Sequence, residues 1–86
     1  MLLKLTKAYF LGYQGTYKPN STTWQRVSIP VTEIQRVEPD CDGAHIVTLG
    51  HDNGCTFPVR WATPVSYERV CAAIEHIWNI SPQVTL

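Results

Sequence analysis

Residues 44–61, AHIVTLGHDNGCTFPVRW, consist of two apolar stretches on either side of an Asn-Gly pair and predict a β-hairpin. A two-residue turn at Asn53-Gly54 would pair Val47 with Arg60 and separate Val47 and Leu49 from the apolar residues of the second strand. A three-residue loop at 52–54, with Gly54 in the left-handed conformation, pairs His51 with Cys55 and Val47 with Val59 instead. We expect this loop because it gathers one apolar face, made of Val47, Leu49, Cys55, Phe57, Val59 and Trp61.

The chain has 86 residues, of which 44% are apolar and 16% charged, so the sequence predicts a single folded domain over residues 1–86. A chain of this size buries only about two-thirds of its unfolded surface, which limits its stability as a monomer. We therefore expect a homo-oligomer, a dimer or larger.

The formal net charge is zero, which argues against a general nucleic-acid binder. Five of the seven Lys and Arg residues, but only one of the seven Asp and Glu residues, lie within residues 1–36. This bias is either chance among few charges, or a basic face for an anionic ligand, or a dipole that docks head to tail.

Cys41, Cys55 and Cys71 are an odd number of cysteines, and neither a signal peptide nor an apolar run of about 20 residues accompanies them. These features predict a protein of the reducing cytoplasm that does not enter a membrane.

Alternation of apolar and polar residues predicts strands over 2–11, 24–31 and 34–38, before a turn over 39–43 and the hairpin. In the first strand Leu3, Leu5, Tyr9 and Leu11 share a face that Lys7 interrupts, which indicates an edge or a ligand-facing position. Thr63 as N-cap and Pro64 as the first helical residue predict a helix over 64–79.

The apolar stripe of this helix comprises Tyr67, Val70, Cys71, Ile74, Ile77 and Trp78. We expect it to cover the sheet face of Val47, Leu49, Phe57 and Val59, with residues 80–86 as a loosely held tail. The predicted fold class is α+β, a small antiparallel sheet of about four to five strands packed against one C-terminal helix.

Residues 12–23, GYQGTYKPNSTT, form a loop that is long for a hairpin and carries Tyr13, Tyr17 and Lys18. It is the best candidate contact loop, although its tyrosines could instead fold back over the sheet edge. The predicted partner- or ligand-binding site adds four residues from the adjoining strands, namely Lys7, Trp24, Arg26 and Arg60. The alternative for the tryptophans is that they cap the core.

Catalytic and metal chemistry are not indicated. Cys41, His45, His51 and Cys55 are spaced C-x3-H-x5-H-x3-C, but the two histidines would lie roughly 20 Å apart on one strand and could not share an ion. His51, Asp52 and Cys55 offer the atoms for nucleophilic catalysis only at an exposed hairpin tip. No glycine-rich phosphate loop is present, so we expect neither an enzyme nor a cofactor.

The segments MLLKLTKA (1–8), VTEIQRVEPD (31–40), IVTLGHDNG (46–54), TFPVRW (56–61) and ERVCAAIEHI (68–77) resemble the FlbD-like small proteins linked to flagellar and swarming motility. Related short proteins occur in phages and prophages. The resemblance covers about residues 2–78 and implies no catalytic residues, and the long 12–23 segment departs from the family's short first hairpin. The opening also resembles the carbon storage regulator family of RNA-binding dimers, which implies Lys4, Lys7 and Arg60 as RNA contacts.

The sequence thus predicts a non-enzymatic binding or regulatory protein, for which the resemblance implies a phage or prophage origin as one possibility. It would engage a protein partner, as a homo-oligomer, through residues 12–23 and the adjoining strands. One alternative is a sequestering protein that holds a small anionic or nucleotide-like ligand between subunits with Arg26, Arg60 and the tyrosines. The other is an RNA-binding regulator, which the zero net charge disfavours.

Overall fold

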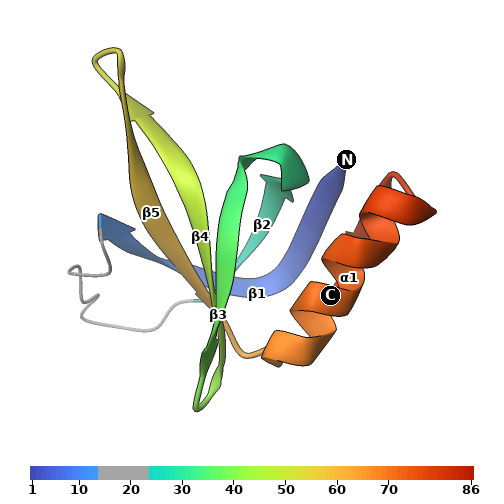
Figure 1. Ribbon diagram of the computed structural model, residues 1–86. Coiled ribbons are helices and arrows are strands. Elements are labelled where there is room, and N and C mark those ends of the chain that lie inside the picture. Colours follow the sequence, from blue (N-terminus) through green and yellow to red (C-terminus); the bar gives the residue numbers. More distant parts are fainter. Residues whose placement is uncertain (14–23) are drawn as a thin grey trace.

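The computed structural model describes residues 1–13 and 24–86 of the chain, and it confirms the α+β class. Five antiparallel strands in the order β2-β1-β5-β4-β3 form a curled sheet, β6 pairs with β1 in parallel, and the helix α1 lies against the sheet (Figure 1). The elements are β1 (Leu2–Tyr13), β2 (Gln25–Pro30), the 3₁₀ turn η1 (Val31–Glu33), β3 (Ile34–Asp40), β4 (Gly43–Asp52), β5 (Cys55–Thr63), α1 (Tyr67–Asn79) and β6 (Gln83–Thr85).

Strand β1 contains an irregularity between Leu5 and Ala8 that shifts its pairing with β2. Leu5 and Ala8 are both buried, whereas Lys7 is exposed. An extra residue in a strand reverses the alternation beyond it, so the charge of Lys7 stays in water while the inward row continues. Tyr9 consequently pairs with Ala62 and leaves the face of Leu5, on which the sequence had placed it.

The prediction of a three-residue hairpin loop is wrong. Asp52 pairs with Cys55 across a two-residue turn in which Asn53 and Gly54 have φ angles of 49° and 79°. Positive φ at both central residues gives a type I′ turn, whose twist matches that of the strands it joins. Asn-Gly is the preferred pair for this turn, so the turn geometry sets the register.

The predicted single apolar face is therefore wrong as well. Val47 pairs with Arg60 and Leu49 with Pro58, whereas Cys55, Phe57, Val59 and Trp61 lie on the other face with Ala44, Ile46 and Thr48. We call the latter the inner face, because Ala44 and Ile46 belong to the main core. Val47 is nevertheless only 1% exposed, because neighbouring side chains on the outer face cover it.

Helix α1 covers one end of the inner face. Its buried residues Val70, Ala73 and Ile77 form one core cluster with Leu3, Leu5, Ala8, Ile29, Val31, Ala44 and Ile46. The expectation that it covers Val47, Leu49, Phe57 and Val59 is wrong because that face does not exist in the observed register.

The helix begins later than predicted, since Ser66 is its N-cap and the Ser66 Oγ accepts a hydrogen bond from the Arg69 backbone nitrogen at 3.3 Å. Thr63 does not cap the helix. Its hydroxyl instead donates to the Lys7 carbonyl at 2.8 Å and ties β5 to β1.

The C-terminal residues, expected to be loosely held, continue the sheet as β6. Leu2, Leu3 and Lys4 pair with Gln83, Val84 and Thr85, and the Leu86 backbone nitrogen donates to the Lys4 carbonyl at 2.8 Å. The two ends of the chain therefore lie side by side in the sheet.

Candidate functional site

The end of the inner face that α1 does not cover is hollow. A groove of about 370 Å³ is lined by residues of β2 and of the β4–β5 hairpin. Figure 1 shows where these strands lie in the curled sheet. We call this hollow the inner groove, and most of its lining is apolar, from Phe10, Val27, Ile29, Pro30, Leu49, Phe57, Val59 and Trp61. The curl of the sheet creates it, because β2 and β5 lie on either side of β1 in the strand order.

Aromatic rings and one glycine shape this groove. The Phe10 and Trp61 rings are tilted by 58° with centroids 5.0 Å apart, and Phe10 remains 39% exposed. A Cβ atom at Gly50 would lie 2.9 Å from both Phe57 Cε2 and Val59 Cγ1. Gly50 therefore lets these two side chains lie across the backbone of β4. A glycine inside a strand is a sequence signal of such close approach, so Gly50 could have indicated this contact from the sequence.

Polar groups are few in the inner groove. The described residues that line it include Ser28, Thr48, His51 and Glu33, and no lysine or arginine. Glu33, in η1 and half-buried, is the one carboxylate among them. A negative charge beside aromatic faces favours a cationic group over an anionic one.

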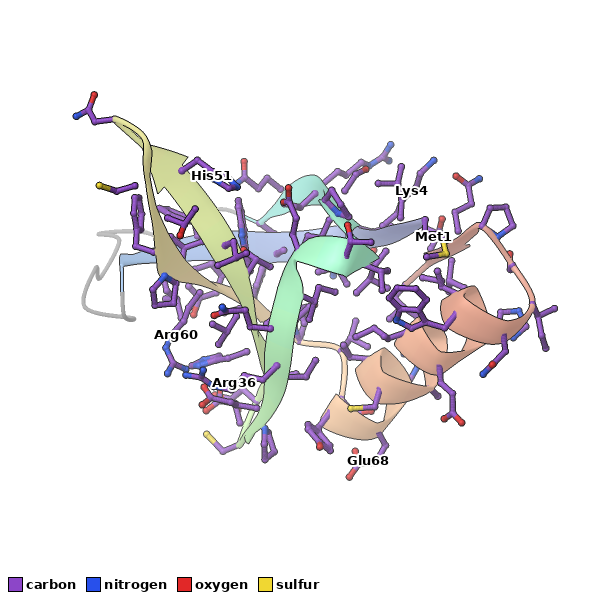
Figure 2. All side chains as sticks on the ribbon, turned by 45° about the horizontal axis from the view of Figure 1, so that its top comes forward. Met1, Lys4, Arg36, His51, Arg60 and Glu68 are labelled. Carbon is purple, nitrogen blue, oxygen red and sulfur yellow. The ribbon has the colours of Figure 1, made fainter. Side chains whose placement is uncertain are left out.

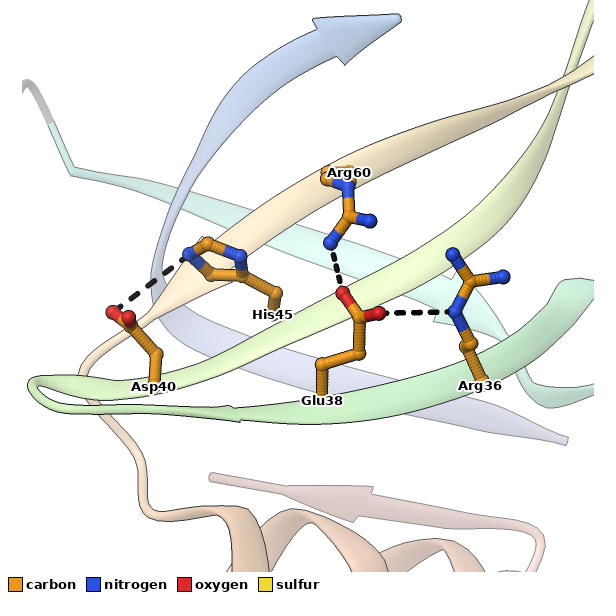
Figure 3. A network of polar contacts seen from close by, with 5 residues as sticks. All are labelled: Arg36, Glu38, Asp40, His45 and Arg60. Carbon is orange, nitrogen blue, oxygen red and sulfur yellow. Dashed lines mark hydrogen bonds and ion pairs between the residues drawn. The ribbon is translucent and has the colours of Figure 1, made fainter. Parts of the chain in front are cut away.

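The outer face of the sheet carries a separate polar network (Figure 3). Glu38 accepts from Arg60 Nη1 and from Arg36 Nε, the latter at 3.1 Å. Both arginines pair with Val47 in the sheet, one from each side, so their aliphatic stems flank and cover it. His45 Nε2 lies 3.7 Å from Asp40 Oδ2 at the margin of this network.

Glu38 gives the fold a testable pH dependence. The hydrogen bond from Arg60 lowers the pKa of the Glu38 carboxyl below its ordinary 4.5, against the opposing effect of partial burial, and Arg36 lowers it further. Because the folded-state pKa is the lower one, the unfolded chain takes up the proton first on acidification. The stabilisation that ionised Glu38 gains from the two arginines is therefore complete above pH 4.5. It is lost as the pH falls through the folded-state pKa of Glu38.

We expect Glu38→Gln to remove that part of the acid sensitivity, so that the urea midpoint of the variant falls less between neutral and acidic pH than that of the wild type. Glu75→Gln is the matched control, since Glu75 is an exposed carboxylate on α1 with no ion pair among the described residues. Equal pH dependence for Glu38→Gln and the control would contradict the assignment.

The structure does not gather the predicted site residues into one place. Tyr17, Lys18 and the side chain of Tyr13 lie outside what the structure describes. Trp24 is 41% exposed, and its ring is tilted by 59° against that of Tyr9, with centroids 4.8 Å apart. Arg60 belongs to the outer network, on a different strand from the exposed Lys7 of β1 and Arg26 of β2.

Arg26 instead lines, together with Lys4, a second hollow of about 340 Å³ between β1, β2 and β6. The hydroxyl residues Thr6, Ser28 and Thr85 complete its polar lining. Lys4 and Arg60 lie toward opposite sides of the molecule in Figure 2, so these two cations do not form one anion site.

The histidines and cysteines remain dispersed. Within residues 1–13 and 24–86, no three His, Cys, Asp or Glu side chains cluster closely enough to hold a metal ion. His51 pairs with Thr56, so the predicted pairing of His51 with Cys55 is wrong. Cys41, Cys55 and Cys71 are free thiols. None of the helical segments described has the length and apolar character needed to cross a membrane.

Comparisons with protein-family models, with curated proteins and with solved structures find no match for this chain. The resemblance to FlbD-like and phage proteins therefore stays a prediction, and the geometry of the site carries the functional argument.

Proposed function

We propose that this protein is a non-enzymatic binding protein whose inner groove holds an extended segment of a protein partner. The segment carries an apolar side chain next to a lysine or arginine. The observation that supports this function is the inner groove itself, which is apolar and aromatic and has Glu33 as its one carboxylate among the described lining residues.

The dimensions and surfaces of the groove suit such a segment. Its volume of about 370 Å³ lies at the lower end of the range of small-molecule binding sites, about 300–1,000 Å³. Apolar burial contributes about 25 cal/mol per Å² to binding. A cation over Phe10 or Trp61 gains roughly 0.5–2 kcal/mol more.

Strand β2 adds backbone recognition. It lies at the end of the strand order, so one of its edges is unpaired by any described strand. An extended peptide beside such an edge forms main-chain hydrogen bonds while alternate side chains enter the groove. Of the predicted contact loop, 12–23, Gly12 and Tyr13 are the last residues of β1, and residues 14–23 lie outside the described part of the chain.

A random peptide library displayed on phage tests the proposal. Panning against the wild-type protein should enrich peptides in which an apolar or aromatic residue neighbours Lys or Arg. For a selected synthetic peptide, Glu33→Gln should weaken binding about three- to tenfold through loss of the charge interaction, while Glu75→Gln leaves it unchanged.

Gly50→Val tests the shape of the groove, because its side chain would displace Phe57 and Val59. We expect this variant to stay folded, as judged by circular dichroism, and to lose most peptide affinity. Failure to enrich any peptide, or peptides that bind wild type, Glu33→Gln and Gly50→Val equally, would refute the proposed site.

A second candidate function is the binding of a small anion at the hollow where Lys4 and Arg26 meet. Two cations and three hydroxyl groups there could hold a phosphate. Inorganic phosphate and nucleotides should then raise the melting temperature of the wild type but not of Arg26→Gln, and a flat response in both would eliminate this function.

A further inference from the structure

Strand β3 is the second edge of the sheet, and no described strand covers its free side. It pairs with β4 alone among the described strands. Between β3 and α1 lies a groove of about 430 Å³, lined by apolar side chains that include Ile34, Val37, Ile74 and Trp78. We call this the edge groove, and Trp78 in it is 55% exposed.

Only part of the apolar stripe of α1 is buried against the core, and the rest lines the edge groove. Val70, Ala73 and Ile77 are buried against the core, whereas Tyr67, Cys71 and Ile74 are only half-buried at the side of the helix that faces β3. Exposed edge strands beside apolar surface readily pair with another strand.

The charges on β3 are self-complementary. Arg36, Val37 and Glu38 follow one another, so two copies of β3 paired antiparallel about Val37 place each Arg36 opposite the other copy's Glu38. Arg36 and Glu38 keep 53% and 34% of their side chains exposed, so both can take part in a further contact. In this register the two Val37 residues face each other on the helix side.

We propose that two copies of this protein associate about a twofold axis at Val37, by antiparallel pairing of their β3 strands. The two sheets become one continuous sheet, the two α1 helices lie on the same face of it, and each incoming strand enters the partner's edge groove. The cross-strand ion pairs between Arg36 and Glu38 fix the register. This surface is separate from the inner groove and does not depend on the function proposed above.

Charge exchange tests the register. The wild type should sediment with a mass near twice the 9.7 kDa of one chain. Arg36→Glu alone places like charges together, as does Glu38→Arg alone, so each should raise the dissociation constant at least about tenfold. An equimolar mixture of the two variants restores both attractive pairs and should form a heterodimer.

Glu68→Arg and Arg69→Glu, which change exposed charges on α1 away from the edge groove, are the matched controls and should remain dimeric. A monomeric wild type, variants that dimerise as well as the wild type, or a mixture that stays monomeric would each overturn the proposal.

Because Glu38 also pairs with Arg60, a cross-linking experiment gives an independent answer should Glu38→Arg fail to fold. In a background in which all three native cysteines are replaced by serine, oxidation of Val37→Cys should give a covalent dimer, since the two introduced cysteines face each other. Gln35→Cys should not, because position 35 lies opposite position 39. Absence of the dimer at position 37, or equal yield at position 35, would overturn the proposed pairing.

Discussion

Replacement of Gly43 with alanine should destabilise this protein more than any other single change to a glycine described here. A Cβ atom at position 43 would lie 2.0 Å from the Thr63 carbonyl oxygen and 2.8 Å from two backbone atoms of Pro64. These are backbone atoms at the end of β5, so no side-chain rotation relieves the clash. The φ angle of +148° adds strain for any residue with a Cβ.

The expected loss is about 3 kcal/mol or more, from overpacking and backbone strain together. A chain of 86 residues has a total stability of roughly 4–13 kcal/mol, so the variant should be partly or wholly unfolded at physiological temperature. Urea denaturation followed by circular dichroism measures this directly.

Gly54→Ala separates the two causes of this loss. Gly54 also has a positive φ, of +79°, but nothing lies within 4 Å of a Cβ built there. Its substitution should cost only the conformational strain, about 1–2 kcal/mol. If Gly43→Ala were no less stable than Gly54→Ala, the close approach of the β3–β4 turn to β5 would not be a constraint on the fold.

Ile46→Ala should lower the free energy of unfolding by about 2–5 kcal/mol, the usual cost of emptying a packed core position. Ile46 is fully buried in the main core cluster. Leu49→Ala should cost only about 1 kcal/mol, because Leu49 is only half-buried and lies on the outer face of the sheet, away from the main core cluster.

This pair of variants distinguishes the two hairpin registers. The register with a three-residue loop would bury Leu49 beneath α1 and turn Ile46 to the outer face, which reverses the order of the two losses. Chemical denaturation of both variants at neutral pH therefore tests the observed turn at Asn53-Gly54. A larger loss for Leu49→Ala would contradict it.

The fold class and the single helix could be predicted because each depends on local periodicity. The register of the β4–β5 hairpin could not be predicted in this way. The prediction assumed that all large apolar residues of the hairpin share one face. Val47 is buried on the outer face by the stems of Arg36 and Arg60, and small Ala44 and polar Thr48 are buried on the inner face. Tertiary contacts from other strands decide both.

The inner groove also could not be predicted from the local sequence pattern. Val27 and Val59 belong to strands far apart in the sequence, and only the curl of the sheet brings them to one hollow. The irregularity at Lys7, which turns Phe10 inward toward this groove, leaves no sign in the alternation except the misplaced lysine. Gly50 was the one residue whose type indicated a close contact in this groove, the contact of its backbone with Phe57 and Val59.

The pairing of β1 with β6 sets the order in which the molecule can be completed during synthesis. Leu2, Leu3 and Lys4 leave the ribosome about 80 residues before their partners at positions 83–85. Until then this part of β1 lacks its neighbour on one side, and a nascent chain with an open strand border is vulnerable to misassembly. We therefore expect the native sheet to close only after translation has passed residue 85.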